Sequence, residues 1–207
     1  MAKLSTINPT RQELLKLRKK LKTAQLGHKL LRDKLESLMR EFLNRISRLK
    51  NKKDNLEERL PLFYRAFFRA QAELGEDQAL SLLSHIPSAR LGVRIDNIMG
   101  AKGLEYKLDN LEEISSAPFS KMASTADMDE AREESINILA DLMEYASIEQ
   151  QLRSLAEEIE KTRRRVNVLE YIFIPELLRT KKIITHKLEE SERMSRAVLM
   201  KLKSQLR

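Results

Sequence analysis

Residues 157–182 of the chain, EEIEKTRRRVNVLEYIFIPELLRTKK, decide its fold. Along this stretch and just before it, apolar or small side chains recur at alternating steps of three and four residues, a spacing that keeps one stripe of a helix turned toward a partner helix. The stripe consists of Leu152, Leu155, Ile159, Thr162, Val166, Leu169 and Phe173. Most positions between these are charged, too many for a face buried in a globular core. The pattern therefore predicts one half of a coiled coil.

The N-terminal part of the chain has the same rhythm. Its stripe consists of Leu14, Leu17, Leu21, Ala24, His28, Leu31, Leu35, Leu38 and Phe42, and then of Ile46 and Leu49. A narrow apolar stripe is stable only when a second stripe removes it from water, so we predict that the two ends of the chain pair as an antiparallel two-helix coiled coil. The polar His28 lies on this seam, and we expect it to be a packed residue that helps to fix the register.

Composition agrees with a fold dominated by α-helices. The chain has 207 residues with five Gly, five Pro, no Trp and 34% charged residues, and four of the glycines lie between positions 75 and 103. We predict a long N-terminal helix within residues 1–75, a small middle region over 76–126 and a long C-terminal helix within 127–207. Thr10 and Glu13 have the spacing of a capping box at the first helix start. Pro61 and Pro175 are expected to kink or interrupt the helices.

The middle region predicts a short helix over 78–85, a β-hairpin at about 91–108 and a linker over 110–126. In the hairpin, apolar residues alternate with polar or small ones on each side of an expected Gly-Ala-Lys-Gly turn at 100–103. An isolated hairpin is marginal in water, so its apolar face is expected to cover the helical rod or a partner subunit. That face consists of Leu91, Val93, Ile95, Leu104, Tyr106 and Leu108.

No catalytic, cofactor or metal site is predicted. His28, His85 and His186 are isolated from other metal-ligating residues, and the chain has no cysteine and no Gly-rich phosphate loop. No stretch has the length of a signal peptide's apolar region or the roughly 20 apolar residues of a membrane span. We therefore expect a soluble protein.

The net charge of +8 is unevenly distributed. Residues 1–60 carry 17 basic and seven acidic groups and residues 161–207 carry 13 and five, whereas residues 61–130 carry seven and 11. An antiparallel pairing would bring the two basic stretches to the same end. The Arg163–Arg165 run is either a solvated face paired with glutamates or a contact surface for an acidic partner.

Two kinds of function are compatible with these features. A basic helical hairpin could bind RNA by counterion release, although the chain shows no aromatic platform for base stacking. A purely structural coiled coil would self-associate through its stripe. Co-purification would separate these functions. An RNA-binding protein would be recovered with nucleic acid, a structural coiled coil with further copies of itself, and a subunit of a nucleotide-driven complex with nucleotide-binding subunits.

Three blocks of sequence resemble one family of known proteins. The first block is 8–38, with Asn8-Pro9-Thr10-Arg11, Gly27-His28, Leu30-Leu31 and Lys34; the second is EKTRRRVNVLEYIFIP, with Thr162, Arg164, Arg165, Val166, Asn167, Leu169, Glu170 and Pro175; the third is Asn97-Ile98-Met99. In order and at both ends of the chain, these blocks resemble the D-subunit family of V-type (archaeal and bacterial V/A-type) rotary ATPases and ATP synthases.

The resemblance implies a non-catalytic rotor in the central stalk of a rotary ion-translocating complex. Its paired terminal helices would enter a hexamer of catalytic A and non-catalytic B subunits, the small F subunit would bind along the rod, and a linking subunit would join the rod to a membrane ring that carries protons or sodium ions. It would be cytoplasmic and peripheral, with only indirect membrane contact and no nucleic acid bound. The expected partner-contact residues are Arg11, Lys16, Lys19, Lys20, Lys22, Arg163, Arg164, Arg165, Asn167, Glu170, Val93, Ile95 and Tyr106.

Overall fold

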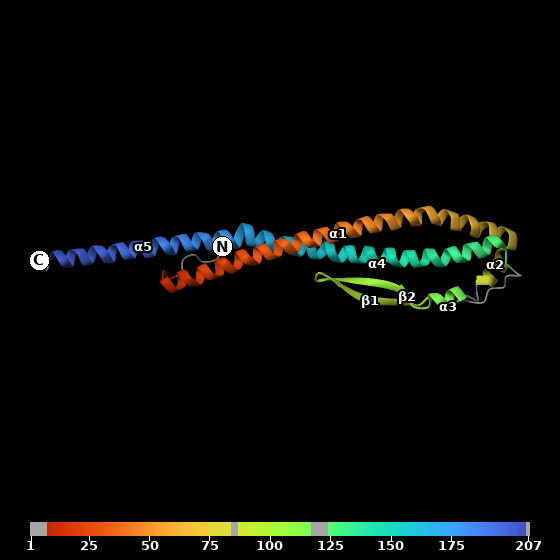
Figure 1. The fold of residues 1–207 in the computed structure, drawn as a ribbon, viewed down its shortest axis with the longest axis horizontal. Coiled ribbons are helices and arrows are strands. Elements are labelled where there is room, and N and C mark those ends of the chain that lie inside the picture. Colours follow the sequence, from red (N-terminus) through yellow and green to blue (C-terminus); the bar gives the residue numbers. More distant parts are fainter. Residues whose placement is uncertain (1–7, 84–86, 117–123, 206–207) are drawn as a thin grey trace. The chain divides into compact units, whose positions relative to one another are not determined.

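The computed structural model describes residues 8–83, 87–116 and 124–205. The elements in chain order are α1 (Arg11–Leu74), α2 (Glu76–Leu83), β1 (Leu91–Ile98), β2 (Ala101–Leu108), α3 (Leu111–Ser116), α4 (Ala126–Val168), a π-helical turn η1 (Leu169–Phe173) and α5 (Ile174–Gln205) (Figure 1). The predicted helix-dominated fold with one antiparallel hairpin is confirmed. None of the described helices is both long and apolar enough to cross a membrane.

Helix α1 begins where its capping residues predict. The hydroxyl of Thr10 accepts a hydrogen bond of 3.2 Å from the backbone N–H of Glu13, which satisfies one of the free donors of the first turn. Pro61 lies inside α1, and the helix continues past it to Leu74, so the proline does not end the helix. Because Pro61 has no backbone N–H, the carbonyl of Glu57 loses its intrahelical hydrogen bond. Both residues are exposed, so this carbonyl lies on a solvated side of the helix.

The chain divides into two compact units, which we describe separately. Unit 1 comprises residues 1–37 and 160–207, and unit 2 comprises residues 38–159. In unit 1 the start of α1 runs antiparallel to the C-terminal helices, since Arg11 pairs with Glu192 and His28 faces Glu170. The buried residues of this seam are Leu17, Leu21, Ala24, Thr162, Val166, Thr180 and Ile184. The predicted pairing of the two ends is confirmed within this unit.

The seam of unit 1 changes phase at the π-helical turn. The N–H of Ile174 donates to the carbonyl of Leu169, a step of five residues that replaces the α-helical step of four just before Pro175, which has no N–H to donate. The extra residue rotates the following helix. Phe173, expected on the seam, is consequently 43% exposed, and Ile174 takes the inward position. The assignment of Phe173 to the stripe was therefore wrong.

Unit 2 contains two small apolar cores. Leu38 of α1 and Leu155 of α4 pack with Ile98 and Ala101 at the turn end of the hairpin. The second core joins the last turns of α1 to α2 and to the start of α4, through Ala70, Ala79 and Met128, with Phe67 and Leu74 packed against it. Ile46, expected to continue the stripe, is 40% exposed, because the neighbouring Arg45 occupies the inward position instead.

The centre of the hairpin turn lies two residues before its predicted position, between residues 99 and 100 instead of between 101 and 102. Ile98 pairs with Ala101, so the turn consists of Met99 and Gly100, both with positive φ, and the side-chain oxygen of Asn97 accepts the N–H of Gly100 at 3.0 Å. This is the backbone of a two-residue I′ turn. Gly103, expected in the turn, lies in β2, where an added Cβ would be 2.7 Å from Cγ of Gln151. Its role is close packing of β2 on α4.

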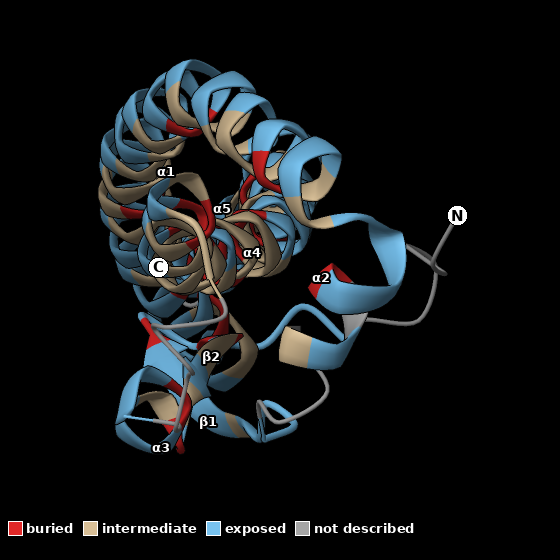
Figure 2. Cartoon of the chain, turned by 90° about the vertical axis from the view of Figure 1, so that its right-hand side faces the viewer, coloured by how far each residue is buried: buried red, intermediate tan, exposed pale blue. Residues whose placement is uncertain are grey.

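The apolar face of the hairpin covers the helices of unit 2 only in part. Its β2 members Tyr106 and Leu108 are half-buried and line a cavity with Met143 and Ile148 of α4. The opposite face contacts α1 and α4 near the turn, through Ile98 and Ala101. The face with Leu91, Val93 and Ile95 points outward, and Figure 2 shows β1 largely exposed. The expected contact with the rod is therefore made by the β2 side of this face, and the β1 side is exposed.

Two further boundaries of the middle region differ from expectation. Residues 111–116, assigned to a linker, form α3, because Asn110 anchors this segment: its side chain accepts the N–H of Arg90 at 2.7 Å and donates to the carbonyl of Ser88 at 2.9 Å. The short helix α2 begins at Glu76, and the predicted end at His85 lies outside the described residues.

Candidate partner-binding surfaces

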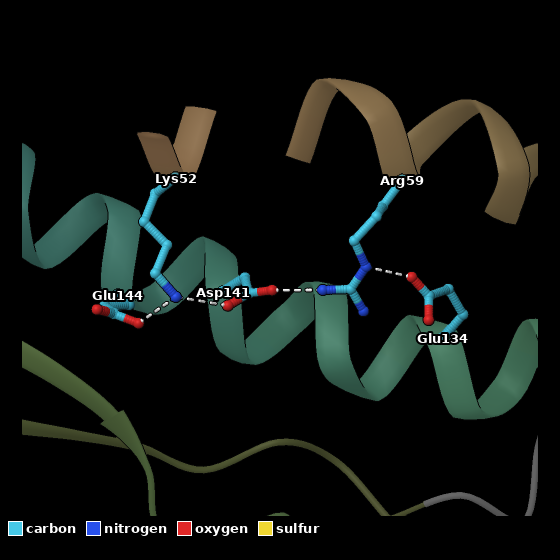
Figure 3. A network of polar contacts seen from close by, with 5 residues as sticks. All are labelled: Lys52, Arg59, Glu134, Asp141 and Glu144. Carbon is cyan, nitrogen blue, oxygen red and sulfur yellow. Dashed lines mark hydrogen bonds and ion pairs between the residues drawn. The ribbon is translucent and has the colours of Figure 1, made fainter. Parts of the chain in front are cut away.

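A network of ion pairs crosses the seam of unit 2 (Figure 3). Arg59 of α1 donates to Glu134 at 2.5 Å and to Asp141 at 2.7 Å, and Lys52 donates to Asp141 at 3.0 Å and pairs with Glu144 at 2.7 Å. Asp141 is therefore shared by both cations. Charged side chains that must meet across a seam fix the register of the two helices, because a shift by one turn would leave them unpaired.

The sequence contained a signal for this network that apolar periodicity did not reveal. Arg45, Lys52 and Arg59 are spaced by seven residues, and so are Glu134 and Asp141 on the opposite helix. Seven residues is the repeat that returns a coiled-coil position to the seam. A search for opposite charges at heptad spacing would have identified these residues.

The network predicts a loss of stability in acid. The guanidinium of Arg59, which donates a hydrogen bond to Glu134, holds the pKa of that carboxyl below its ordinary value. The stabilisation is present above the ordinary glutamate pKa of about 4.3 and is lost as the pH falls through the lower folded-state value. We expect the difference in unfolding free energy between the wild type and Glu134→Gln to be largest near pH 7 and to shrink between about pH 5 and pH 3. Urea titrations at several pH values would measure it, and a constant difference would contradict the assignment.

The basic residues predicted to contact a partner share unit 1. Arg11 pairs with Glu192 at 2.7 Å and Lys16 with Glu13 at 2.8 Å, both on the surface. Within the described part of the chain, Lys19, Lys20 and Lys22 are exposed and form no ion pair within 4 Å, although Lys16 and, more weakly, Lys20 lower the pKa of Glu13. Cations held without internal partners remain available to carboxylates of another protein.

The arginine run in unit 1 is partly engaged. Arg164 pairs with Glu160, whereas Arg163 and Arg165 are exposed and unpaired among the described residues. The half-buried His28 has its Nε2 atom 3.5 Å from Glu170, without a hydrogen bond. Asn167 is also exposed. The interpretation of this run as a solvated face paired with glutamates therefore holds for Arg164. Arg163 and Arg165 form an exposed cationic surface.

Exposed apolar side chains accompany these charges in unit 1. Tyr171 is 71% exposed, and the others are similarly accessible; the set comprises Leu26, Leu30, Val168, Tyr171 and Ile172. Single exposed apolar residues are common on monomers, but several large ones on one unit indicate a contact surface. We call this set the apolar band.

The remaining predicted contact residues lie on the hairpin in unit 2. Val93 and Ile95 are exposed, whereas Tyr106 is half-buried and its backbone N–H donates to the hydroxyl of Ser147 on α4 at 2.8 Å. Tyr106 therefore attaches β2 to α4. Among the residues that the structure describes, no group of three acidic or histidine side chains is arranged to hold a metal ion.

Comparison with known proteins identifies the family of this chain. The model of the family described as the D subunit of ATP synthase matches residues 13–204. The chain belongs to this family. It is 40% identical over 211 residues to the V-type ATP synthase D subunit of Clostridium novyi (strain NT), covering 100% of this chain and 97% of that protein. It is 37% identical over 199 residues to the protein of that name from Thermoanaerobacter sp. (strain X514), with 95% of each chain covered.

Membership in the D-subunit family of ATP synthases weighs against the RNA-binding alternative left open by the sequence. A third relative, from Fusobacterium nucleatum subsp. nucleatum, has the same name and is 40% identical over 209 residues, which is 100% of this chain and 98% of that protein. The similarity covers both long helices and the hairpin. An RNA-binding helical hairpin is therefore not favoured.

Proposed function

We propose that this chain is the central-stalk rotor subunit of a V/A-type rotary ATPase or ATP synthase. It couples ATP hydrolysis or synthesis in a hexamer of catalytic A and non-catalytic B subunits to transport of protons or sodium ions through a membrane ring. The small F subunit and the subunit that links the stalk to the ring are its other partners. The chain has no catalytic site, and it acts at the cytoplasmic face of the membrane.

The observation that carries this proposal is the contrast between the buried seam of unit 1 and the side chains exposed on its outer surface. Its apolar seam is satisfied internally, from Leu17 to Ile184, while its outer surface carries unpaired cations and the apolar band. A free protein has no use for such an outer surface, because it leaves apolar area in water. A sleeve of surrounding subunits would cover it.

Coupling requires that the shaft be asymmetric. The three lysines Lys19, Lys20 and Lys22 lie in the first turns of α1, whereas the apolar band lies further along the rod, at Leu26 and Leu30 of α1 and at Val168, Tyr171 and Ile172 of the other helix. A catalytic interface that meets the lysines therefore has a different interaction energy from one that meets the apolar band. Rotation moves these contacts from one interface to the next, and each contact biases the nucleotide state of the interface it touches.

A charge-neutralised shaft tests the proposal. We expect Lys19→Gln, Lys20→Gln and Lys22→Gln together to lower the number of ions transported per ATP hydrolysed by about twofold or more, because contacts that distinguish the interfaces are lost. The complex reconstituted with the A, B and F subunits and the membrane ring would be assayed in vesicles. ATP hydrolysis and ion uptake would be measured on the same sample.

The matched control removes three exposed cations from the part of α1 in unit 2, through Lys50→Gln, Arg65→Gln and Arg69→Gln. It changes the net charge by the same amount and should leave the ratio unchanged. Equal ratios in the wild type and both variants would count against a role for the basic surface. Failure of the wild-type chain to assemble with the A and B subunits would contradict the proposed function itself.

A further inference from the structure

The outer edge of β1 has unpaired backbone groups. In a hairpin closed by the Ile98–Ala101 pair, hydrogen-bonded and non-hydrogen-bonded pairs alternate from the turn, which makes Val93↔Tyr106 and Ile95↔Leu104 non-hydrogen-bonded. The N–H and C=O groups of Val93 and Ile95 therefore point away from β2. The bond from the N–H of Tyr106 to Ser147 agrees with this alternation, since Tyr106 also points outward, toward α4.

The two edges of the hairpin consequently differ. Ser147 covers the β2 edge at Tyr106, whereas β1 is exposed over almost all of its eight residues (Figure 2). Proteins usually protect such an edge with proline, a bulge or a short strand, but β1 is regular in its pairing and contains no proline. The side chains on the exposed face of β1 are apolar, with Val93 53% and Ile95 74% exposed. An open backbone edge beside an apolar face is suited to an added strand.

The charges of β1 restrict the occupant. Arg94 and Asp96 are exposed and, in the described part of the chain, neither forms an ion pair within 4 Å, although Asp96 lines a cavity with Arg45 and Arg48 of α1. Glu105, which lies across from Arg94 in the ladder, is paired instead with Lys107 at 3.0 Å. A strand that pairs with β1 would therefore gain from a carboxylate opposite Arg94 and a cation opposite Asp96, with apolar residues between them that continue the outward face.

We propose that β1 receives an extended segment of another subunit as a third antiparallel or parallel strand. The segment alternates apolar residues with charged ones, and its charges are complementary to Arg94 and Asp96. The backbone groups of Val93 and Ile95 bond to it, and their side chains extend the apolar face onto it. This inference rests on the proposed function, because it requires that the chain operate within a complex of several subunits.

Hydrogen exchange of single backbone amides tests the proposal directly. In the isolated full-length chain, the amides of Arg94 and Asp96, which bond to β2, should exchange more slowly than the outward amides of Val93 and Ile95. In the complex purified through a tag on this chain, the amides of Val93 and Ile95 should slow by roughly 100-fold or more, which removes the alternation. Mass spectrometry with electron-transfer fragmentation resolves these positions.

A pair of variants separates strand pairing from simple apolar contact. Val93→Pro removes an outward N–H and leaves the bonds between β1 and β2 intact, whereas Val93→Thr keeps that N–H on a β-branched residue. In the complex, Val93→Pro should reduce the protection of the Ile95 amide by about tenfold, and Val93→Thr should retain it.

The three outcomes are distinct. A complex that contains nucleotide-binding subunits but leaves Val93 and Ile95 exchanging as in the isolated chain overturns the added strand and leaves the proposed function standing. Protection that appears in the isolated chain and disappears on dilution assigns the edge to a second copy and overturns the proposal. Recovery of the chain alone, with fast exchange at both amides, contradicts the added strand and the proposed function together.

Discussion

Leu155→Ala is expected to lower the free energy of unfolding by about 2–5 kcal/mol. Leu155 of α4 is 0% exposed and packs against Leu38 of α1 and against Ile98 and Ala101 at the hairpin turn. Truncation would leave a cavity where these three elements meet, and the surroundings cannot close it without moving β2 against Gln151. Urea unfolding followed by circular dichroism would measure the loss.

Leu142→Ala is the matched control for this prediction, because it removes the same atoms from the same helix at a position that is 38% exposed. Its cost should stay below about 1.5 kcal/mol. The amide of Ile98 should also exchange faster in Leu155→Ala than in the control, since the turn of the hairpin loses its support. Equal costs for the two variants would show that the hairpin is not anchored by this core.

Asp141→Asn should have the second largest effect, a loss of about 1–3 kcal/mol at neutral pH. The aspartate is the shared acceptor of Lys52 and Arg59, and its side chain is only 22% exposed. An amide of the same size keeps the packing but removes the negative charge between the two cations, which then repel each other. Urea unfolding at pH 7 would measure the loss.

The control for Asp141→Asn is Glu57→Gln, which removes an acid whose ion pair with Lys53 is on the surface. Surface pairs of this kind contribute about 0–1 kcal/mol, so this variant should be close to the wild type. Raising the salt concentration should diminish the effect of Asp141→Asn less than that of Glu57→Gln, because partly buried charges are screened less. A neutral effect of Asp141→Asn would show that the network does not stabilise unit 2.

The helical part of the fold could be predicted because its signal is periodic. Leu17, Leu21 and Ala24 on one side, and Leu152, Leu155 and Val166 on the other, follow the three-and-four spacing and are all buried. The capping residues located the start of α1 in the same way, since their chemistry is local. Long elements with repeated local signals are determined by the sequence near them.

The hairpin was only partly predictable because both of its faces contain residues that can be buried. The alternation identified the strands, but Leu91, Val93 and Ile95 form a more apolar face than Ile98, Ala101 and Gly103. The second set packs on the helices because glycine and alanine permit close approach of β2 to α4. That choice depends on contacts between distant segments, which a pattern within one segment does not contain.

For the candidate partner surfaces, the sequence predicted which residues are exposed but not which of them contact other residues of the chain. Exposed lysines follow from their spacing off the seam, but the pairing of Arg164 with Glu160, and the covering of Tyr106 by Ser147, required the structure. The charged network on the seam was missed because the periodicity of apolar residues does not register charges that occupy inward positions.

The π-helical turn before Pro175 affects how this chain can be engineered. One additional residue in a helical turn advances every later side chain by about 100° around the axis. A chimera could replace Leu169–Phe173 with a regular α-helical segment that is one residue shorter, and the downstream residues would then keep their present direction around the helix axis. A regular α-helical replacement of equal length would instead turn Thr180 and Ile184, which are now buried, toward solvent. Grafts between family members should therefore be joined outside this turn.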